Sequence, residues 1–73
     1  MGTNQLFSKS WETDIDKIIV SVYSYNNGPK KLQISRNSRD AQGEFKFAKL
    51  GRMTKQEVEG ILPLIQDAMS YLD

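Results

Sequence analysis

Aromatic, amide and cationic side chains alternate with aliphatic ones in two neighbouring stretches, residues 17–25 and 31–36, and Asn37 follows the second stretch directly. If both stretches are strands, alternate side chains share one face. The face that carries the aromatic rings consists of Ile19, Ser21, Tyr23, Tyr25, Lys31, Gln33, Ser35 and Asn37. Rings among positive charges suit a single-stranded nucleic acid, because bases stack on aromatic planes while lysine neutralises phosphate, without readout of base edges. The pattern therefore indicates a binding surface rather than a reaction centre.

Two flanking segments contain further rings and cations that would extend this surface. The side chains expected to neutralise phosphates are Lys9, Lys30, Lys31, Lys46 and Lys49, helped by Arg36, Arg39 and Arg52, and those expected to stack bases are Trp11, Tyr23, Tyr25 and Phe47, with Asn37 beside them. A solvated face stays equally open, since tyrosine favours strands and lysine protects exposed strand edges. Trp11 has a second interpretation as a partly buried core or dimer residue. Phe45 and Phe47 alternate with Lys46, so at least one face of their strand is expected to be core.

The composition excludes several kinds of site. The chain has no Cys and no His, so it lacks thiolate nucleophiles, imidazole acids and bases, disulfides and the usual zinc ligands. The neighbouring pairs Asp14 with Asp16 and Glu57 with Glu59 are expected to be solvated carboxylates. We therefore expect no enzyme, cofactor, metal or small-molecule substrate. No apolar stretch is long enough to span a membrane and no secretion leader is evident, which predicts a cytoplasmic protein.

Length and charge suggest how the chain is organised. Its 73 residues predict one domain, 1–73, whose small core favours a homodimer. The net charge of +1 is unevenly distributed. Residues 1–52 are basic and residues 53–73 are acidic, so the two parts are expected to do different jobs.

The alternating stretches are expected to form a hairpin. The segment between them, Asn26-Asn27-Gly28-Pro29, consists of residues that favour turns. A loop over residues 26–30 would pair Tyr25 with Lys31 and Val22 with Ile34, and would keep the aliphatic side chains on one face. Further strands are expected over residues 6–12 and over 44–53, the latter with a bulge around Lys49, and the polar run 37–43 is expected to be an exposed turn.

The acidic end predicts a helix that begins at Thr54. Thr54 and Glu57 form a capping-box pattern. The apolar stripe that follows consists of Val58, Ile61, Leu62, Ile65, Ala68, Met69 and Leu72. Pro63 predicts a kink or break near Gly60. A stripe wider than one small sheet needs is a candidate subunit interface. The fold class is thus α+β, with a four-stranded antiparallel curved sheet followed by one C-terminal helix.

This order of elements and several short motifs resemble the single-stranded-DNA-binding domain of the eukaryotic transcriptional positive cofactor four and its bacterial relatives. The residues that carry the resemblance are Val20-Ser21-Val22, Tyr25, Gly28, Lys30, Leu32-x-Ile34, Asp40-x-x-Gly43-Glu44-Phe45-Lys46, Lys49 and the capped helix. The resemblance covers residues 17–72. It implies a homodimer packed through its helices, with curved sheets that hold single strands without strong sequence preference.

The resemblance also implies roles for single residues. Lys46 and Lys49 match family lysines that contact DNA, Tyr25 matches a stacking aromatic, and Lys30 lies near another contacting lysine. The family commonly has an aromatic where this chain has Asn37-Ser38, and an arginine where it has Ser35, so Trp11 is a candidate replacement for the missing ring. The residues expected at the dimer interface are Ile61, Leu62, Leu64, Ile65, Met69 and Leu72.

The expected function is that of a bacterial single-stranded-DNA-binding protein acting in transcription, replication, repair or DNA uptake, with RNA as a possible competitor. The alternative is a protein-interaction module that uses the aromatic sheet face and the apolar helix.

Overall fold

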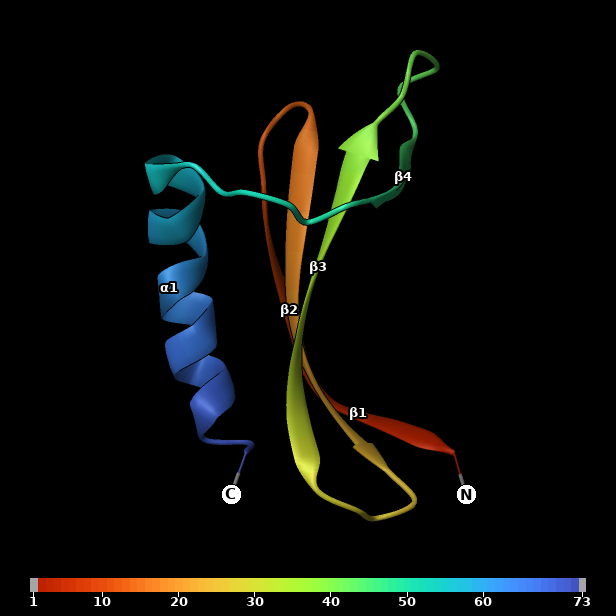
Figure 1. Cartoon of the computed structure of the whole chain (residues 1–73), viewed down its shortest axis with the longest axis vertical. Helices are drawn as coiled ribbons and strands as arrows, with labels where there is room; N and C mark the ends of the chain where they lie inside the picture. Colours follow the sequence, from red (N-terminus) through yellow and green to blue (C-terminus); the bar gives the residue numbers. More distant parts are fainter. Residues whose placement is uncertain (1, 73) are drawn as a thin grey trace.

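The computed structural model describes residues 2–72 and contains four strands followed by one helix. They are β1 (Thr3–Glu12), β2 (Asp16–Tyr25), β3 (Lys30–Arg39), β4 (Phe45–Ala48) and α1 (Lys55–Met69). The strands form one antiparallel sheet in the order β1-β2-β3-β4. The long strands twist strongly, and α1 runs beside them on one side (Figure 1). The expected α+β fold, an antiparallel four-stranded sheet followed by a C-terminal helix, is confirmed.

The turn between β2 and β3 is tighter than the sequence predicted. Asn26 and Asn27 both have positive φ, and the Gly28 N–H donates to the Tyr25 carbonyl at 2.8 Å, as in the two-residue turns that suit twisted hairpins. The ladder that follows the turn pairs Ser24 with Lys30 and Val22 with Leu32, not Val22 with Ile34. This register differs from the predicted one by two residues, so each side chain keeps its predicted face.

The core lies between α1 and the first two strands. Ile18, Val20 and Val22 of β2 are fully buried. Phe7 covers them from β1, and the helix contributes Ile61 and Ala68. One face of β2 therefore packs against α1, and the opposite face does not take part in this core.

The capping box at the start of α1 is confirmed. The Glu57 N–H donates to the Thr54 hydroxyl, and the Thr54 N–H donates to the Glu57 carboxylate. The helix is continuous through Pro63, so the expected break near Gly60 does not occur. Packing on both sides of the proline, through Ile61 and Ala68, holds the helix together despite the lost backbone hydrogen bond.

The fourth strand is shorter than predicted, and the third is longer. The Asp40 carboxylate accepts the N–H groups of Gln42 and Glu44, which fixes a turn directly after Arg39. Residues 37–39 therefore belong to β3, and only residues 40–44 form the turn. After Ala48 the chain leaves the sheet and crosses toward α1 (Figure 1). The predicted fourth strand is therefore confirmed over residues 45–48, while its extension to residue 53 with a bulge around Lys49 is wrong.

Candidate nucleic-acid interface

The sheet face turned away from α1, here called the outer face, gathers most of the aromatic side chains of the strands. Its composition follows from strand alternation and register. From one end to the other, the aligned side chains are Thr3 and Tyr25; Gln5, Tyr23 and Lys31; Ser8, Ser21 and Gln33; Ser10, Ile19 and Ser35; Glu12, Lys17, Asn37 and Phe47; and lastly Arg39 and Phe45. Rings therefore gather at both ends of the face, and small polar side chains fill its middle.

The hairpin end of the outer face is a shallow depression built on two tyrosines. Tyr25 is 65% exposed, while the half-buried Tyr23 donates its hydroxyl hydrogen to the Gln5 side-chain oxygen at 3.1 Å. The depression has a volume of about 630 Å³ and is lined by Thr3, Tyr23, Tyr25, Pro29, Lys31, Leu32 and Gln33. Its apolar lining and one exposed lysine offer both a stacking plane and a phosphate contact.

The opposite end of the outer face carries two phenylalanines of β4. The guanidinium carbon of Arg39 lies 4.4 Å from the centre of the Phe45 ring, and Lys17 approaches the same ring at 6.0 Å. Arg39 is fixed in place by hydrogen bonds to the carbonyls of Asp14 and Gly43. No residue of β4 is buried, so the expectation that one face of this strand is core is wrong.

Phe47 is the most exposed ring of the outer face. Its side chain is 82% exposed, and it lies opposite Asn37 in the sheet. Exposing so large an apolar side chain is costly unless something covers it, because apolar area gains from leaving water. Phe47 is therefore the clearest single sign of a binding surface on this face.

Positive charge accompanies the rings. Strand alternation places Lys17, Lys31 and Arg39 on the outer face, and Glu12 is the one carboxylate that it places there among residues 2–72. Glu12 lies 4.0 Å from the Lys17 ammonium, an exposed pair that is worth little. The face is net positive, as a polyanion would require.

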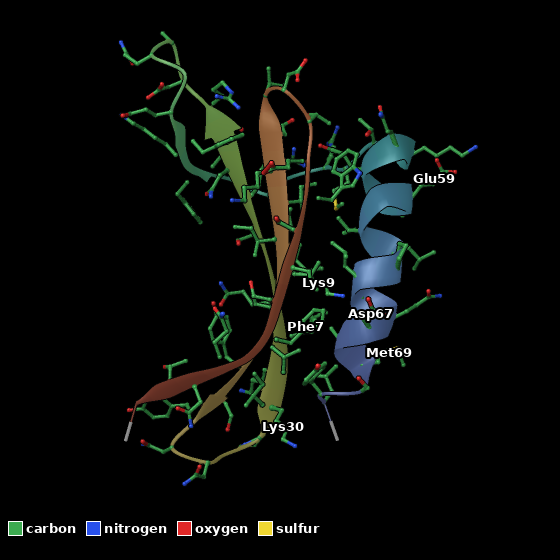
Figure 2. All side chains as sticks on the ribbon, turned by 180° about the vertical axis from the view of Figure 1, so that it is seen from behind. Phe7, Lys9, Lys30, Glu59, Asp67 and Met69 are labelled. Atoms are coloured by element: carbon green, nitrogen blue, oxygen red, sulfur yellow. The ribbon has the colours of Figure 1, made fainter. Side chains whose placement is uncertain are left out.

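Lys9 and Trp11 lie on the other side of the sheet. A bulge between Gln5 and Phe7 reverses the alternation of β1. Lys9 therefore aligns with Val20, and Trp11 with Ile18, on the face of the sheet that packs against α1. Lys9 forms an ion pair with Asp67 of α1 at 3.2 Å, and the two side chains point toward each other in Figure 2. A Cβ placed on Gly60 would overlap the Trp11 ring, so the ring lies directly against the helix backbone. The expectation that these two residues join the stacking surface is therefore wrong, and Trp11 packs against the helix instead.

Arg36 is a buried structural residue rather than part of the exposed surface. Its guanidinium donates two hydrogen bonds to the Glu57 carboxylate, at 2.6 and 3.3 Å, and lies 3.3 Å from Asp16. It also donates to the Leu50 carbonyl. The hydrogen bonds from Arg36 and from the Thr54 backbone lower the pKa of Glu57, and the hydrogen bond to Glu57 raises the pKa of Arg36. Arg36 thus joins β3, the β4–α1 connection and the helix.

The remaining predicted cations are not on the outer face. Lys46 aligns with Ser38 on the α1 side of the sheet and lies 3.2 Å from the Asp40 carboxylate. A backbone hydrogen bond from Glu44, and then the contact with Lys46, lower the pKa of Asp40. Lys30 lies at the hairpin end of β3 (Figure 2). Lys49 and Arg52 are exposed in the connection between β4 and α1.

Among the outer-face residues that were absent from the predicted binding set are Lys17, Gln33 and Phe45. Strand alternation had already placed Gln33 on this face, and the same alternation places Lys17 there. Phe45 could not be found in this way, because its face depends on where the Asp40 turn begins β4.

The predicted dimer residues fall into two groups. Ile61 is 3% exposed and belongs to the core, so it is not available to a partner, whereas Leu62 and Met69 are 49% and 60% exposed. Leu64, Ile65 and Leu72 are half-buried against the core. Val58, absent from the predicted set, is also exposed. Val58, Leu62, Ile65 and Met69 recur at helical spacing and form what we call the outer helix stripe.

Within residues 2–72, α1 is too short and too polar to cross a membrane. In three comparisons with known proteins, the chain matches no family model, no curated protein and no solved structure.

Proposed function

We propose that the outer face binds single-stranded DNA with little dependence on base sequence. The observation that carries this proposal is the exposure of Phe47 and Tyr25 at opposite ends of a sheet face that also bears Lys31 and Arg39. Exposed rings flanked by cations are what unpaired bases and their phosphates require together.

The two ends of the face would act as separate stacking stations. Tyr23 and Lys17 mark these ends on β2, and the six residue steps between them span about 20 Å in a strand. A single strand lying along this path stacks bases at both ends, and each stacked base contributes about 1 to 3 kcal/mol. Duplex DNA cannot do the same, since its bases are already stacked on one another.

Salt dependence follows from the number of phosphates neutralised. The three cations of the outer face are Lys17, Lys31 and Arg39. With about 0.7 released counterions per phosphate on a single strand, the slope of log affinity against log salt is expected to be about −2 for each protomer.

The experiment that tests the proposal is fluorescence anisotropy with labelled oligothymidine of ~20 nucleotides and a duplex of equal length. The single strand is expected to bind more tightly than the duplex, and Tyr25→Ala and Phe47→Ala are each expected to weaken it at least about fivefold. Lys31→Ala is expected to lower both affinity and salt slope, while the matched exposed lysine on the helix, Lys55→Ala, changes neither. Equal binding of single strand and duplex, or no effect of either ring, would contradict the proposal.

We also propose that the protein is a homodimer in which the outer helix stripes of two copies meet. Leu62 and Met69 leave large apolar surfaces in water in a single copy, and a helix that is apolar beyond its core-facing side calls for a second partner. Pairing through α1 leaves the outer face of each copy open to a nucleic acid.

A protein-interaction module is the second candidate function, and the outer helix stripe is the observation that favours it. This function predicts indifference to oligonucleotides and to charge reversal at Lys31 and Arg39. The anisotropy experiment therefore separates the two candidates.

A further inference from the structure

The strand that carries Phe47 has little packing of its own. β4 is four residues long and lies at the edge of the sheet beside β3, and all of its residues are exposed or half-buried. Segments with few buried apolar contacts open locally at a low cost in free energy. Phe47 offers a fixed stacking plane only while β4 stays paired with β3, so contacts from outside the hydrophobic core must hold this strand.

Arg39, the last residue of β3, makes such contacts to three segments. Its Nε donates to the Asp14 carbonyl in the β1–β2 loop, and its Nη1 donates to the Gly43 carbonyl in the turn before β4, each at 2.7 Å. Its guanidinium carbon lies 4.4 Å from the centre of the Phe45 ring. One planar group therefore joins the β1–β2 loop, the β3–β4 turn and the first residue of β4.

The two rings of β4 are in different situations. Phe45 and Phe47 are two residues apart on the same face of the strand, which separates them by about 7 Å along it. Phe45 is half-buried and is covered by the guanidinium of Arg39, whereas Phe47 is 82% exposed. The Phe45 ring therefore attaches β4 to Arg39, and the Phe47 ring stays open to a ligand.

We propose that Arg39 is a positioning residue that acts through Phe45 and the Gly43 turn to hold Phe47 ready for a base, an inference that rests on the proposed single-strand binding. A stacking plane that is fixed before the ligand arrives avoids the entropy cost of ordering it on binding. The shape of the arginine matters here as well as its charge. Lysine has no planar group to lie on a ring and does not present the same rigid fork of N–H donors.

The test is Arg39→Lys, which keeps the positive charge and removes the guanidinium. The variant is expected to bind labelled oligothymidine of ~20 nucleotides roughly threefold to tenfold more weakly, which is part of what one stacked base contributes. The salt slope is expected to stay the same, because the charge is kept. Arg52→Lys, at an exposed arginine of the β4–α1 connection, is the matched control and changes neither affinity nor slope.

Double variants show which aromatic station Arg39 serves. In a protein that already carries Phe47→Ala, Arg39→Lys is expected to cause less than about a twofold further loss of affinity, because the ring that it positions is gone. In a Tyr25→Ala protein it is expected to cause its full loss, since Tyr25 lies at the other end of the outer face. Phe45→Leu, which removes the ring beside the guanidinium, is expected to behave like Arg39→Lys in both backgrounds.

Hydrogen exchange in the free protein tests the positioning without any nucleic acid. The backbone amides of β4 are expected to exchange faster in Arg39→Lys than in the wild-type protein, because local opening of this strand becomes easier. The amides of β2, whose side chains form the core, are expected to keep their exchange rates. Unchanged rates in β2 also show that the variant is folded.

The outcomes distinguish this inference from the function on which it rests. Unchanged affinity of Arg39→Lys, its full loss in the Phe47→Ala background, or unchanged exchange in β4 overturns the positioning role of Arg39 and leaves single-strand binding intact. Failure of the wild-type protein to bind oligothymidine overturns the proposed function and the positioning role together.

Discussion

Arg36 of β3 and Glu57 in the first turn of α1 form a buried ion pair with two hydrogen bonds, at 2.6 and 3.3 Å. Glu57 also accepts the Thr54 backbone N–H that begins the helix. One carboxylate therefore caps the helix and attaches it to the sheet. The residues that stabilise the fold lie on the α1 side of the sheet. The side chains of the outer face are therefore not needed for packing against the helix.

Removing one partner of this pair is expected to destabilise the protein strongly. Arg36→Ala leaves the buried Glu57 carboxylate without its main donor, a change that costs about 3 kcal/mol. The measurement is the free energy of unfolding from urea denaturation. Arg52→Ala, at an exposed arginine in the β4–α1 connection, is the control and should change stability little. Equal stability of the two variants would show that the pair does not hold the helix.

The same pair predicts a loss of stability in acid. The pKa of Glu57 is lower in the folded protein than its ordinary value of 4.5, so its stabilising contribution is fully present above that value. The contribution disappears as the pH falls through the lowered folded pKa. The urea midpoint should therefore drop as the pH falls below about 4.5, and the drop should be smaller in Glu57→Gln. Asp40, whose pKa is also lowered, leaves a residual drop. An identical pH profile in Glu57→Gln would contradict the role of this carboxylate.

Trp11 is expected to matter for the fold and not for binding. Its ring packs on Gly60 of α1, on the side of the sheet opposite Phe47. Trp11→Phe should therefore leave oligothymidine affinity unchanged while it lowers the free energy of unfolding. Phe47→Ala is the matched comparison, because it should weaken oligothymidine binding while it leaves the free energy of unfolding unchanged. A large loss of affinity in Trp11→Phe with unchanged stability would place the binding site on the α1 side.

The outer helix stripe predicts how the dimer can be separated. Leu62→Glu puts a charge in the proposed interface, and burying that unpaired charge is unfavourable. Light scattering after size exclusion should show a dimer for the wild-type protein and a monomer for Leu62→Glu. Gln56→Glu adds the same charge at an exposed position of α1 that does not adjoin the stripe and should remain dimeric. A wild-type monomer at high concentration would overturn the dimer proposal.

Strand alternation was enough to predict both faces of the β2–β3 hairpin. Ile18, Val20 and Val22 are buried as the period of two requires, and Tyr23 and Lys31 share the opposite face. Arg36 follows Leu32 and Ile34 at the same spacing of two residues. Its position on the α1 side of the sheet could therefore also be predicted from the alternation. A charged residue in an aliphatic series signals a buried ion pair.

The rest depends on local irregularities that no periodic pattern contains. The bulge at Leu6 reverses the face of Lys9 and Trp11, and a single inserted residue leaves no repeat to detect. The short β4 follows from the Asp40 carboxylate, which collects two backbone N–H groups and sets where the strand begins. The tight turn of the hairpin depends on the left-handed conformation of Asn26 and Asn27. In each case one side chain or one backbone conformation overrides the average preference of the segment.

The most direct test of the account is to map by NMR which backbone amides shift when oligothymidine is added. Binding at the outer face predicts that the largest shifts cluster at the two aromatic stations, around Tyr23, Lys31 and Phe47, while the exposed side of α1 around Leu62 changes little. Shifts concentrated along α1, or none at saturating oligonucleotide, would contradict the claim that the outer face is a single-strand binding surface.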